Sequence, residues 1–135
     1  MNKNSLKNIA TEVINLEINA LKILKKSINK NFDKAVNTIV NCQSKIILCG
    51  VGKSGLIAAK IASTLSSVGS PAFSLSANDC LHGDLGSITK KDVLILISNS
   101  GRSEEIIPII KFANRNKIKL IGIVSKKNSL LYKGS

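Results

Sequence analysis

The stretch IILCGVGKSG, residues 46–55, joins a short apolar run to a glycine-rich turn. The run IILC has the length and composition of a strand that is buried on both faces of a parallel sheet. The segment LIAAKIASTLSSV that follows contains no helix breaker and ends at Gly69, which is typical of a helix terminus. The stretch therefore predicts a strand, a tight turn and a helix in succession.

The same alternation continues along the chain. An amphipathic pattern covers Leu6 to Ile28, where apolar residues recur at helical spacing opposite lysines and asparagines. Because strands alternate with helices, the strands should be parallel and joined by right-handed crossovers. We therefore predict an α/β fold with one three-layer parallel sheet. Its strands should lie near 45–49, 71–75, 92–98 and 119–124, and its further helices near 32–41, 56–68 and 105–116.

Two segments lack a regular pattern. Residues 76–91 are rich in turn formers and contain His82, the only histidine, so we expect an irregular functional loop. Residues 126–135 follow the last predicted strand, and no covering helix is expected there, as if the domain were cut short. The helix from Leu6 to Ile28 has more apolar surface than so small a sheet can cover, which predicts an oligomer.

The composition fits one domain. A chain of 135 residues with 44% apolar content supports one compact core. The formal charge of +12 comes mostly from lysines spread along the chain, and aromatic residues make up only 3%. This distribution argues against a nucleic-acid-binding module, which concentrates basic and aromatic residues on one face. The charge reflects either a general compositional bias or an attraction for anionic substrates such as phosphates.

The cysteines and the N-terminus bear on the compartment. Cys42, Cys49 and Cys80 have no CxxC spacing, which favours free thiols in a reducing cytoplasm. Near the N-terminus, polar residues interrupt the apolar ones before any run reaches the length of a signal or membrane-spanning segment. We expect a cytoplasmic protein without a membrane segment.

The turn GVGKSG matches the pattern GxGxxG, which alone is a weak signal for a dinucleotide site. Such a site would need an acidic residue at the end of the next strand, where Leu75 stands. The Walker pattern fails because Ile47 occupies the position of its first glycine. With Lys53 and the Ser54 hydroxyl at a helix N-terminus, the turn suits a small oxyanion or a sugar oxygen.

A second loop, SNSGRS, carries three hydroxyls at the start of a predicted helix. Ser98, Ser100 and Ser103 stand there together with the backbone amides around Gly101. Such a cluster neutralises a phosphate without arginine. The alternative is that the serines only cap the helix and shape the turn. Three serines beside a second glycine loop favour the ligand.

Four motifs in this order and spacing resemble one family. GVGKSG, STLSSVGSPAF, LHGDLG and LISNSGRSEE are similar to the sugar isomerase (SIS) domain, specifically to the KpsF/GutQ group of arabinose-5-phosphate isomerases. The resemblance covers about residues 5–130. It implies a flavodoxin-like SIS domain over 1–135, with N-terminal helices at 5–41 and a sugar-phosphate-binding core at 45–130.

The resemblance also implies an activity and roles for single residues. The family interconverts D-arabinose 5-phosphate and D-ribulose 5-phosphate, which supplies the lipopolysaccharide sugar Kdo, in homo-oligomers (dimer or tetramer) without cofactor or metal. The side chains implied in catalysis are Lys53, His82 and Glu105. The implied phosphate loop consists of Ser98, Asn99, Ser100, Gly101 and Ser103. The residues implied to contact the sugar are Gly52, Ser54, Gly69, Ser70 and His82.

The carried-over chemistry has alternatives. Proton transfer between C1 and C2 of a sugar needs a base, a donor for the oxygens and a group that opens the ring. His82 is also compatible with a loop residue that hydrogen-bonds the backbone, and Glu105 with a residue that favours the helix dipole. The sequence departs from the family pattern at Ser76, Cys80 and Arg102.

Segments that carry further catalytic residues and paired CBS domains in the family have no counterpart in this sequence. The base and the ring-opening histidine of the family are usually assigned to those segments. A non-catalytic sugar-phosphate-binding module is therefore the second hypothesis. A nucleotide-dependent oxidoreductase is the third, and it rests on GxGxxG alone.

Overall fold

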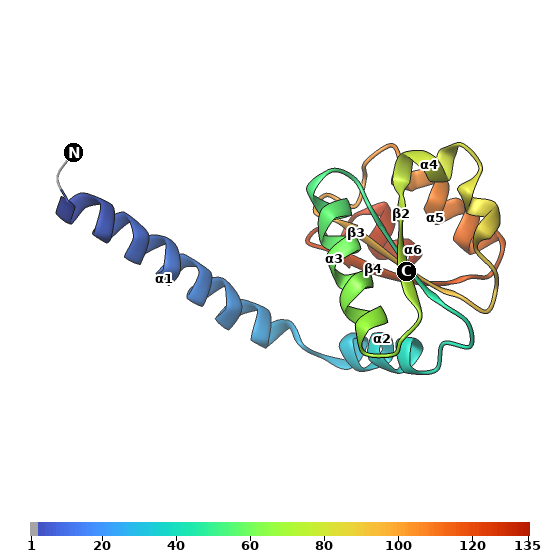
Figure 1. Cartoon of the computed structure of the whole chain (residues 1–135), viewed down its shortest axis with the longest axis horizontal. Helices are drawn as coiled ribbons and strands as arrows, with labels where there is room; N and C mark the ends of the chain where they lie inside the picture. The colour runs from blue at the N-terminus through green and yellow to red at the C-terminus, as the bar shows by residue number, and fades with distance from the viewer. Residues whose placement is uncertain (1–2) are drawn as a thin grey trace. The chain divides into compact units, whose positions relative to one another are not determined.

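The computed structural model describes residues 3–135 (Figure 1), and the chain divides into two units, residues 1–36 and 37–135. Helix α1 (Lys3–Ser27) lies in the first unit and confirms the predicted amphipathic helix. Helix α2 (Lys30–Val40) follows it, close to its predicted bounds. Among the described residues, no helix is both long enough and apolar enough to span a bilayer.

The second unit contains a four-stranded sheet. Its strands are β1 (Ile46–Gly50), β2 (Ala72–Ser76), β3 (Val93–Ser98) and β4 (Lys119–Val124). They are ordered β2-β1-β3-β4, and each neighbouring pair is parallel. The predicted α/β class and parallel sheet are confirmed, and every strand begins and ends within one residue of its predicted position.

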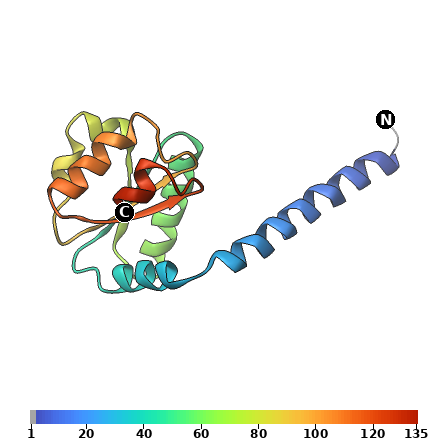
Figure 2. The ribbon, with the colours of Figure 1, turned by 180° about the vertical axis from the view of Figure 1, so that it is seen from behind.

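Helices cover both faces of this sheet (Figures 1 and 2). In chain order they are α3 (Lys53–Ser67), α4 (Ala77–Leu81), the 3-10 helix η1 (Asp84–Ser87), α5 (Ile106–Arg115) and α6 (Leu130–Gly134). Side chains of β1 alternate between two core clusters, so that Leu48 packs with α3 while Ile47 packs with α4, α5 and α6. This alternation establishes the three layers, and Ile39 of α2 packs on the same face as α3.

The segment between β2 and β3 corrects one prediction. The expectation that residues 76–91 are irregular was wrong for their first part, because α4 starts directly after β2 and η1 follows it. Ala77 and Cys80 of α4 are buried, at 3% and 2% exposure. Tertiary packing of these two small side chains onto the sheet and α5 holds a helix that is too short to show a periodic pattern.

The segment after β4 corrects another prediction. We expected no helix in residues 126–135, but α6 covers part of the sheet there. Ser129 caps α6 by accepting a hydrogen bond from the amide of Tyr132 at 3.2 Å, and Leu131 is fully buried in the core. The helix is only five residues long, and its stability depends on this cap and this single anchor.

An ion pair between the half-buried Lys45 and the fully buried Asp92 joins the residues that directly precede β1 and β3. Both carboxylate oxygens of Asp92 accept hydrogen bonds from the Lys45 ammonium, at 3.2 and 3.0 Å, and the amide of Thr89 donates to Asp92 at 2.6 Å. Burial of Asp92 disfavours its charge, but hydrogen bonds from Ser44, Thr89 and Lys45 outweigh burial and lower its pKa to about 2. Asp92 therefore stabilises the fold as a charged group, at the edge opposite the glycine turn.

Candidate functional site

The strand order determines where the two predicted ligand loops meet. From β1 the chain crosses to β2 on one side, and from β2 it returns past β1 to β3 on the other side. The loops that follow β1 and β3 therefore leave the sheet side by side in opposite directions. In parallel sheets such a switch point forms a crevice at the carboxyl ends of the strands, where ligands bind.

The GVGKSG turn brings the start of α3 against the end of β1. A Cβ atom on Gly50 would lie 2.7 Å from the backbone carbonyl carbon of Ser54. A Cβ atom on Gly55 would lie 2.9 Å from the carbonyl oxygen of Gly50. Both positions exclude any larger residue, because backbone meets backbone there. The first role of these two glycines is close packing of helix on strand, which carries Ser54 into the crevice.

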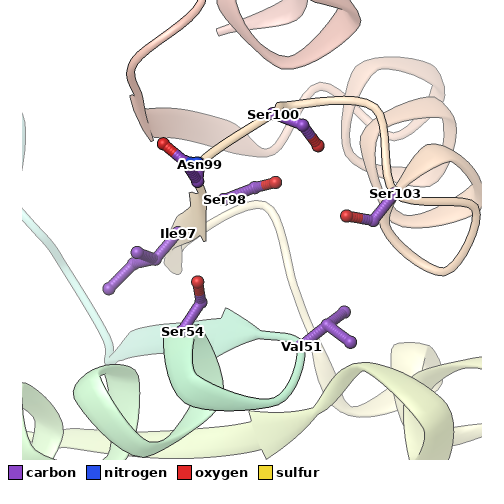
Figure 3. Close-up of a pocket in the computed structure, with 7 residues that line it drawn as sticks. All are labelled: Val51, Ser54, Ile97, Ser98, Asn99, Ser100 and Ser103. Atoms are coloured by element: carbon purple, nitrogen blue, oxygen red, sulfur yellow. The ribbon is translucent and has the colours of Figure 1, made fainter.

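A hollow of about 260 Å³ lies at the switch point (Figure 3). This volume is below the usual range of drug-sized ligand pockets, so it suits a small molecule or one group of a larger ligand. The hydroxyls of Ser98, Ser100 and Ser103 point toward a common space, and Ser54 points toward it from the first turn of α3. The residues that line the hollow are Val51, Ser54, Ile97, Ser98, Asn99, Ser100 and Ser103.

Hydrogen bonds within the serine loop leave its hydroxyl protons available. The amide of Gly101 donates to the Ser98 hydroxyl oxygen at 3.0 Å, and the amide of Arg102 donates to the Ser100 hydroxyl oxygen at 3.3 Å. A serine hydroxyl that accepts in this way still has its own proton to donate. The loop therefore presents hydroxyl donors to the hollow, and donors are what an oxyanion requires.

Asn99 lies at the edge of the hollow and is held from outside it. Its side chain points away from the serine hydroxyls in Figure 3. Its backbone carbonyl accepts a hydrogen bond from the hydroxyl of Ser125 at 2.7 Å, and its side-chain oxygen accepts from the same hydroxyl at 2.5 Å. Asn99 is thus a link between the loop and the segment after β4.

The predicted catalytic side chains all follow strands at the carboxyl edge of the sheet. Lys53 is the first residue of α3 and is exposed, His82 ends α4 and is exposed, and the half-buried Glu105 directly precedes α5. None of the three is among the residues that line the hollow. The structure therefore places them after three different strands of the same edge and outside the lining of the hollow.

The remaining residues predicted to bind substrate divide into two groups. Gly52 directly precedes α3, and Gly101 is buried in the middle of the serine loop. Gly69 and Ser70 lie between α3 and β2, next to Pro71, whose carbonyl accepts a hydrogen bond from the first residue of β1. That position is the amino edge of the sheet, so this fold does not bring Gly69 and Ser70 to the hollow.

Sequence reasoning missed several residues of the site. Val51 and Ile97 form apolar walls of the hollow, and although both lie inside the quoted motifs GVGKSG and LISNSGRSEE, neither was predicted as a site residue. The thiol of Cys80 hydrogen-bonds that of Cys49, and this bond together with burial raises the pKa of Cys49. The pair anchors α4, and hence His82, to the end of β1. Both are free cysteines, as is Cys42.

The family described as SIS domain matches residues 39–135. The chain belongs to the SIS domain family. The matched range contains all four strands and both loops of the hollow. The serine loop and the glycine turn, which the fold brings together, are therefore parts of one SIS domain.

Known relatives of this SIS domain include named isomerases. The chain is 44% identical over 131 residues to the arabinose 5-phosphate isomerase KdsD of Francisella tularensis, with 95% of this chain and 40% of that protein covered. It is 38% identical over 127 residues to the arabinose 5-phosphate isomerase GutQ of Escherichia coli K12, with 94% and 40% covered. This SIS domain thus spans about two fifths of the length of these relatives.

A solved structure shares the fold closely. The E. coli CFT073 protein c3406, in complex with arabinose 5-phosphate, superposes on this chain with a TM-score of 0.92 and 34% sequence identity. The match covers 99% of this chain and 71% of that one. The three-layer arrangement of this SIS domain is therefore that of a known sugar-phosphate-binding protein.

Proposed function

We propose that this SIS domain binds a sugar phosphate through its serine loop and belongs to an aldose-ketose isomerase of D-arabinose 5-phosphate and D-ribulose 5-phosphate. One observation carries the proposal: the hydroxyls of Ser98, Ser100 and Ser103 face one small hollow at the switch point of the sheet. The names of the relatives and the sugar phosphate in the c3406 complex support the same substrate class. The product would supply synthesis of the lipopolysaccharide sugar Kdo.

The phosphate is the group best suited to the hollow. Its oxygens accept hydrogen bonds only. The hydroxyl oxygens of Ser98 and Ser100 accept hydrogen bonds from backbone amides, and each of these hydroxyls still has its own proton to donate. Bonds to a charged acceptor are stronger than neutral ones. The net charge of +12 would raise the local concentration of an anionic substrate. In this arrangement the sugar carbons extend from the serine loop toward the start of α3.

The isomerisation roles follow the chemistry of the edge residues. Lys53 would stabilise the negative charge that develops on the enediolate, because an ammonium close to that oxygen acts mainly in the transition state. His82 would exchange protons with the substrate, and the Glu105 carboxylate would contribute to the reaction beside it, while the base that abstracts the proton would come from the further segments of the family. Contact of Gly52 with the sugar stays a prediction, whereas Gly69 and Ser70 lie at the edge of the sheet opposite to the hollow.

A second function is favoured by a specific observation. Lys53, His82 and Glu105 do not line the hollow that the serine loop forms. A SIS domain that binds a sugar phosphate without converting it would need only the loop. Binding of D-ribulose 5-phosphate without turnover would identify this non-catalytic module, and turnover by this chain would exclude it.

Calorimetric titration of the chain with D-ribulose 5-phosphate and with unphosphorylated ribulose tests the phosphate assignment. We expect binding of the phosphorylated sugar only. Ser100→Ala and Ser103→Ala should each weaken binding by about 1 kcal/mol, the usual value of one hydrogen bond. Ser67→Ala, which removes an exposed hydroxyl at the C-terminal end of α3, is the matched control. Equal affinity for both sugars would refute the proposed function.

The assembly and compartment are also proposals. Helix α1 exposes a row of large apolar side chains, among them Leu16 at 63%, Leu21 at 64% and Ile23 at 69%. So continuous an apolar face is a feature of surfaces that contact other proteins. We infer that it contributes to a homo-oligomer. Three free cysteines and a phosphorylated sugar substrate are consistent with the cytoplasm.

A further inference from the structure

The segment that follows β4 is bonded to the serine loop along its length. The amide of Ser125 donates to the carbonyl of Asn99 at 3.3 Å, and the Ser125 hydroxyl reaches two oxygens of the same residue. Further along, the guanidinium of Arg102 donates to the carbonyl of Asn128 at 3.1 Å, and the amide of Leu131 donates to the carbonyl of Gly101 at 3.2 Å.

Packing reinforces these bonds at the middle of the loop. Gly101 is buried with a φ of +64°, and a Cβ atom there would lie 2.6 Å from the Cβ of Ser129 and 2.7 Å from a methyl carbon of Val124. Ser129 itself is fully buried, so it cannot move aside. The segment 124–131 therefore touches the serine loop from Asn99 to Arg102.

The topology explains why these two segments meet and on which side. β3 and β4 are parallel neighbours, and Ser98 is in register with Val124, so the residues after both strands leave the same edge. The Asn99 side chain, which receives the Ser125 hydroxyl, points away from the serine hydroxyls in Figure 3. The segment 124–131 thus supports the loop from the side opposite to the hollow.

We propose that Ser125 is a positioning residue for the phosphate loop: by holding Asn99 turned outward, its hydroxyl aims the Ser98 and Ser100 hydroxyls into the hollow. This inference rests on the proposed function. A hydroxyl has one proton, so Ser125 shares it between the backbone and side-chain oxygens of Asn99. Both oxygens belong to the residue between the two serines, and this shared bond sets the direction of the chain there.

Ser125 is exposed, and this separates positioning from general stability. Removal of an exposed hydroxyl leaves no buried group unpaired, so the midpoint of thermal unfolding should stay near that of the wild type. The loop, by contrast, loses the bond that orients Asn99. The affinity for a phosphorylated sugar should therefore fall while the fold keeps its stability.

The experiment compares D-ribulose 5-phosphate binding by the wild-type chain and by Ser125→Ala, Ser125→Thr and Ser67→Ala. We expect Ser125→Ala to weaken binding about fivefold to tenfold, the equivalent of one hydrogen bond. Ser125→Thr keeps the hydroxyl and should restore affinity. Ser67→Ala removes a comparable exposed hydroxyl that donates to a helix carbonyl at 2.7 Å, and it should bind like the wild type.

Two measurements separate the possible outcomes. Amide NMR shifts of Ser100 and Gly101 should change in Ser125→Ala and not in Ser67→Ala, which reports the loop position without ligand. Two results would overturn the positioning role while leaving the phosphate site intact. One is a Ser125→Ala variant that binds D-ribulose 5-phosphate as tightly as the wild type. The other is a Ser125→Ala variant whose midpoint of thermal unfolding falls together with its affinity for D-ribulose 5-phosphate. If the wild-type chain does not bind D-ribulose 5-phosphate more tightly than ribulose, the proposed function itself is refuted.

Discussion

Replacement of Gly101 by alanine tests whether the segment after β4 holds the serine loop in place. Gly101 combines a φ of +64° with a crowded environment, since an added Cβ would lie 2.6 Å from the Cβ of Ser129 and 2.7 Å from a methyl carbon of Val124. Gly69 has a φ of +87°, but an added Cβ would meet nothing within 4 Å. Gly69→Ala therefore measures the backbone strain alone, and Gly101→Ala measures strain and crowding together.

The expected magnitudes differ by the crowding. A left-handed backbone costs an alanine about 1–2 kcal/mol, so Gly69→Ala should lower the free energy of unfolding by that amount. Overpacking of a buried site adds about 1–3 kcal/mol, which brings Gly101→Ala to about 2–5 kcal/mol. The larger loss should coincide with loss of D-ribulose 5-phosphate binding, because the loop must shift to admit the methyl group.

Urea denaturation followed by circular dichroism gives both free energies from the transition midpoints, provided that the slope m stays constant. The difference between the two variants is the informative quantity, because both share the backbone strain. Equal destabilisation by Gly101→Ala and Gly69→Ala would mean that Ser129 and Val124 do not press on the loop. That result would also remove the packing support from the segment 124–131.

Three further predictions concern other parts of the chain. Asp92→Asn should lower the free energy of unfolding by about 2 kcal/mol at pH 7. Because the pKa of Asp92 is lowered from 3.8 to about 2, this loss of stability should shrink as the pH falls below about 4 and vanish below 2. A loss of stability that does not depend on pH would contradict the prediction. Gly50→Ala should lower the free energy of unfolding by at least about 1–3 kcal/mol, because the added methyl group pushes Ser54 and α3 away from β1. A urea midpoint equal to that of the wild type would argue against close contact between Gly50 and Ser54. The chain should sediment as an oligomer at tens of micromolar, and Leu16→Lys with Leu21→Lys should dissociate it; a wild-type monomer would refute the role of α1.

The order of elements in the core followed from local patterns. IILC and VLILI are continuous apolar runs, as expected of strands covered on both faces, and their burial agrees with that. Alternation with helices then required parallel strands, since crossovers place helices on the faces. The two short helices α4 and α6 escaped prediction, because a five-residue helix has no periodicity and depends on one or two anchors such as Leu131.

The candidate site likewise has one part that local sequence predicted and another that only the tertiary structure brought together. Local sequence marked the serine loop and the glycine turn, because hydroxyls, glycines and helix starts have recognisable spacing. Which of those residues share one hollow was decided by the strand order β2-β1-β3-β4, which sets the loops after β1 and β3 side by side and leaves Gly69 and Ser70 at the other edge. Ser125 and Ser129 support the loop from about 26 residues away in sequence, a distance over which no local pattern carries information. Only the pairing of β3 with β4 brings them to Asn99 and Gly101, because parallel neighbours release their following residues at one common edge.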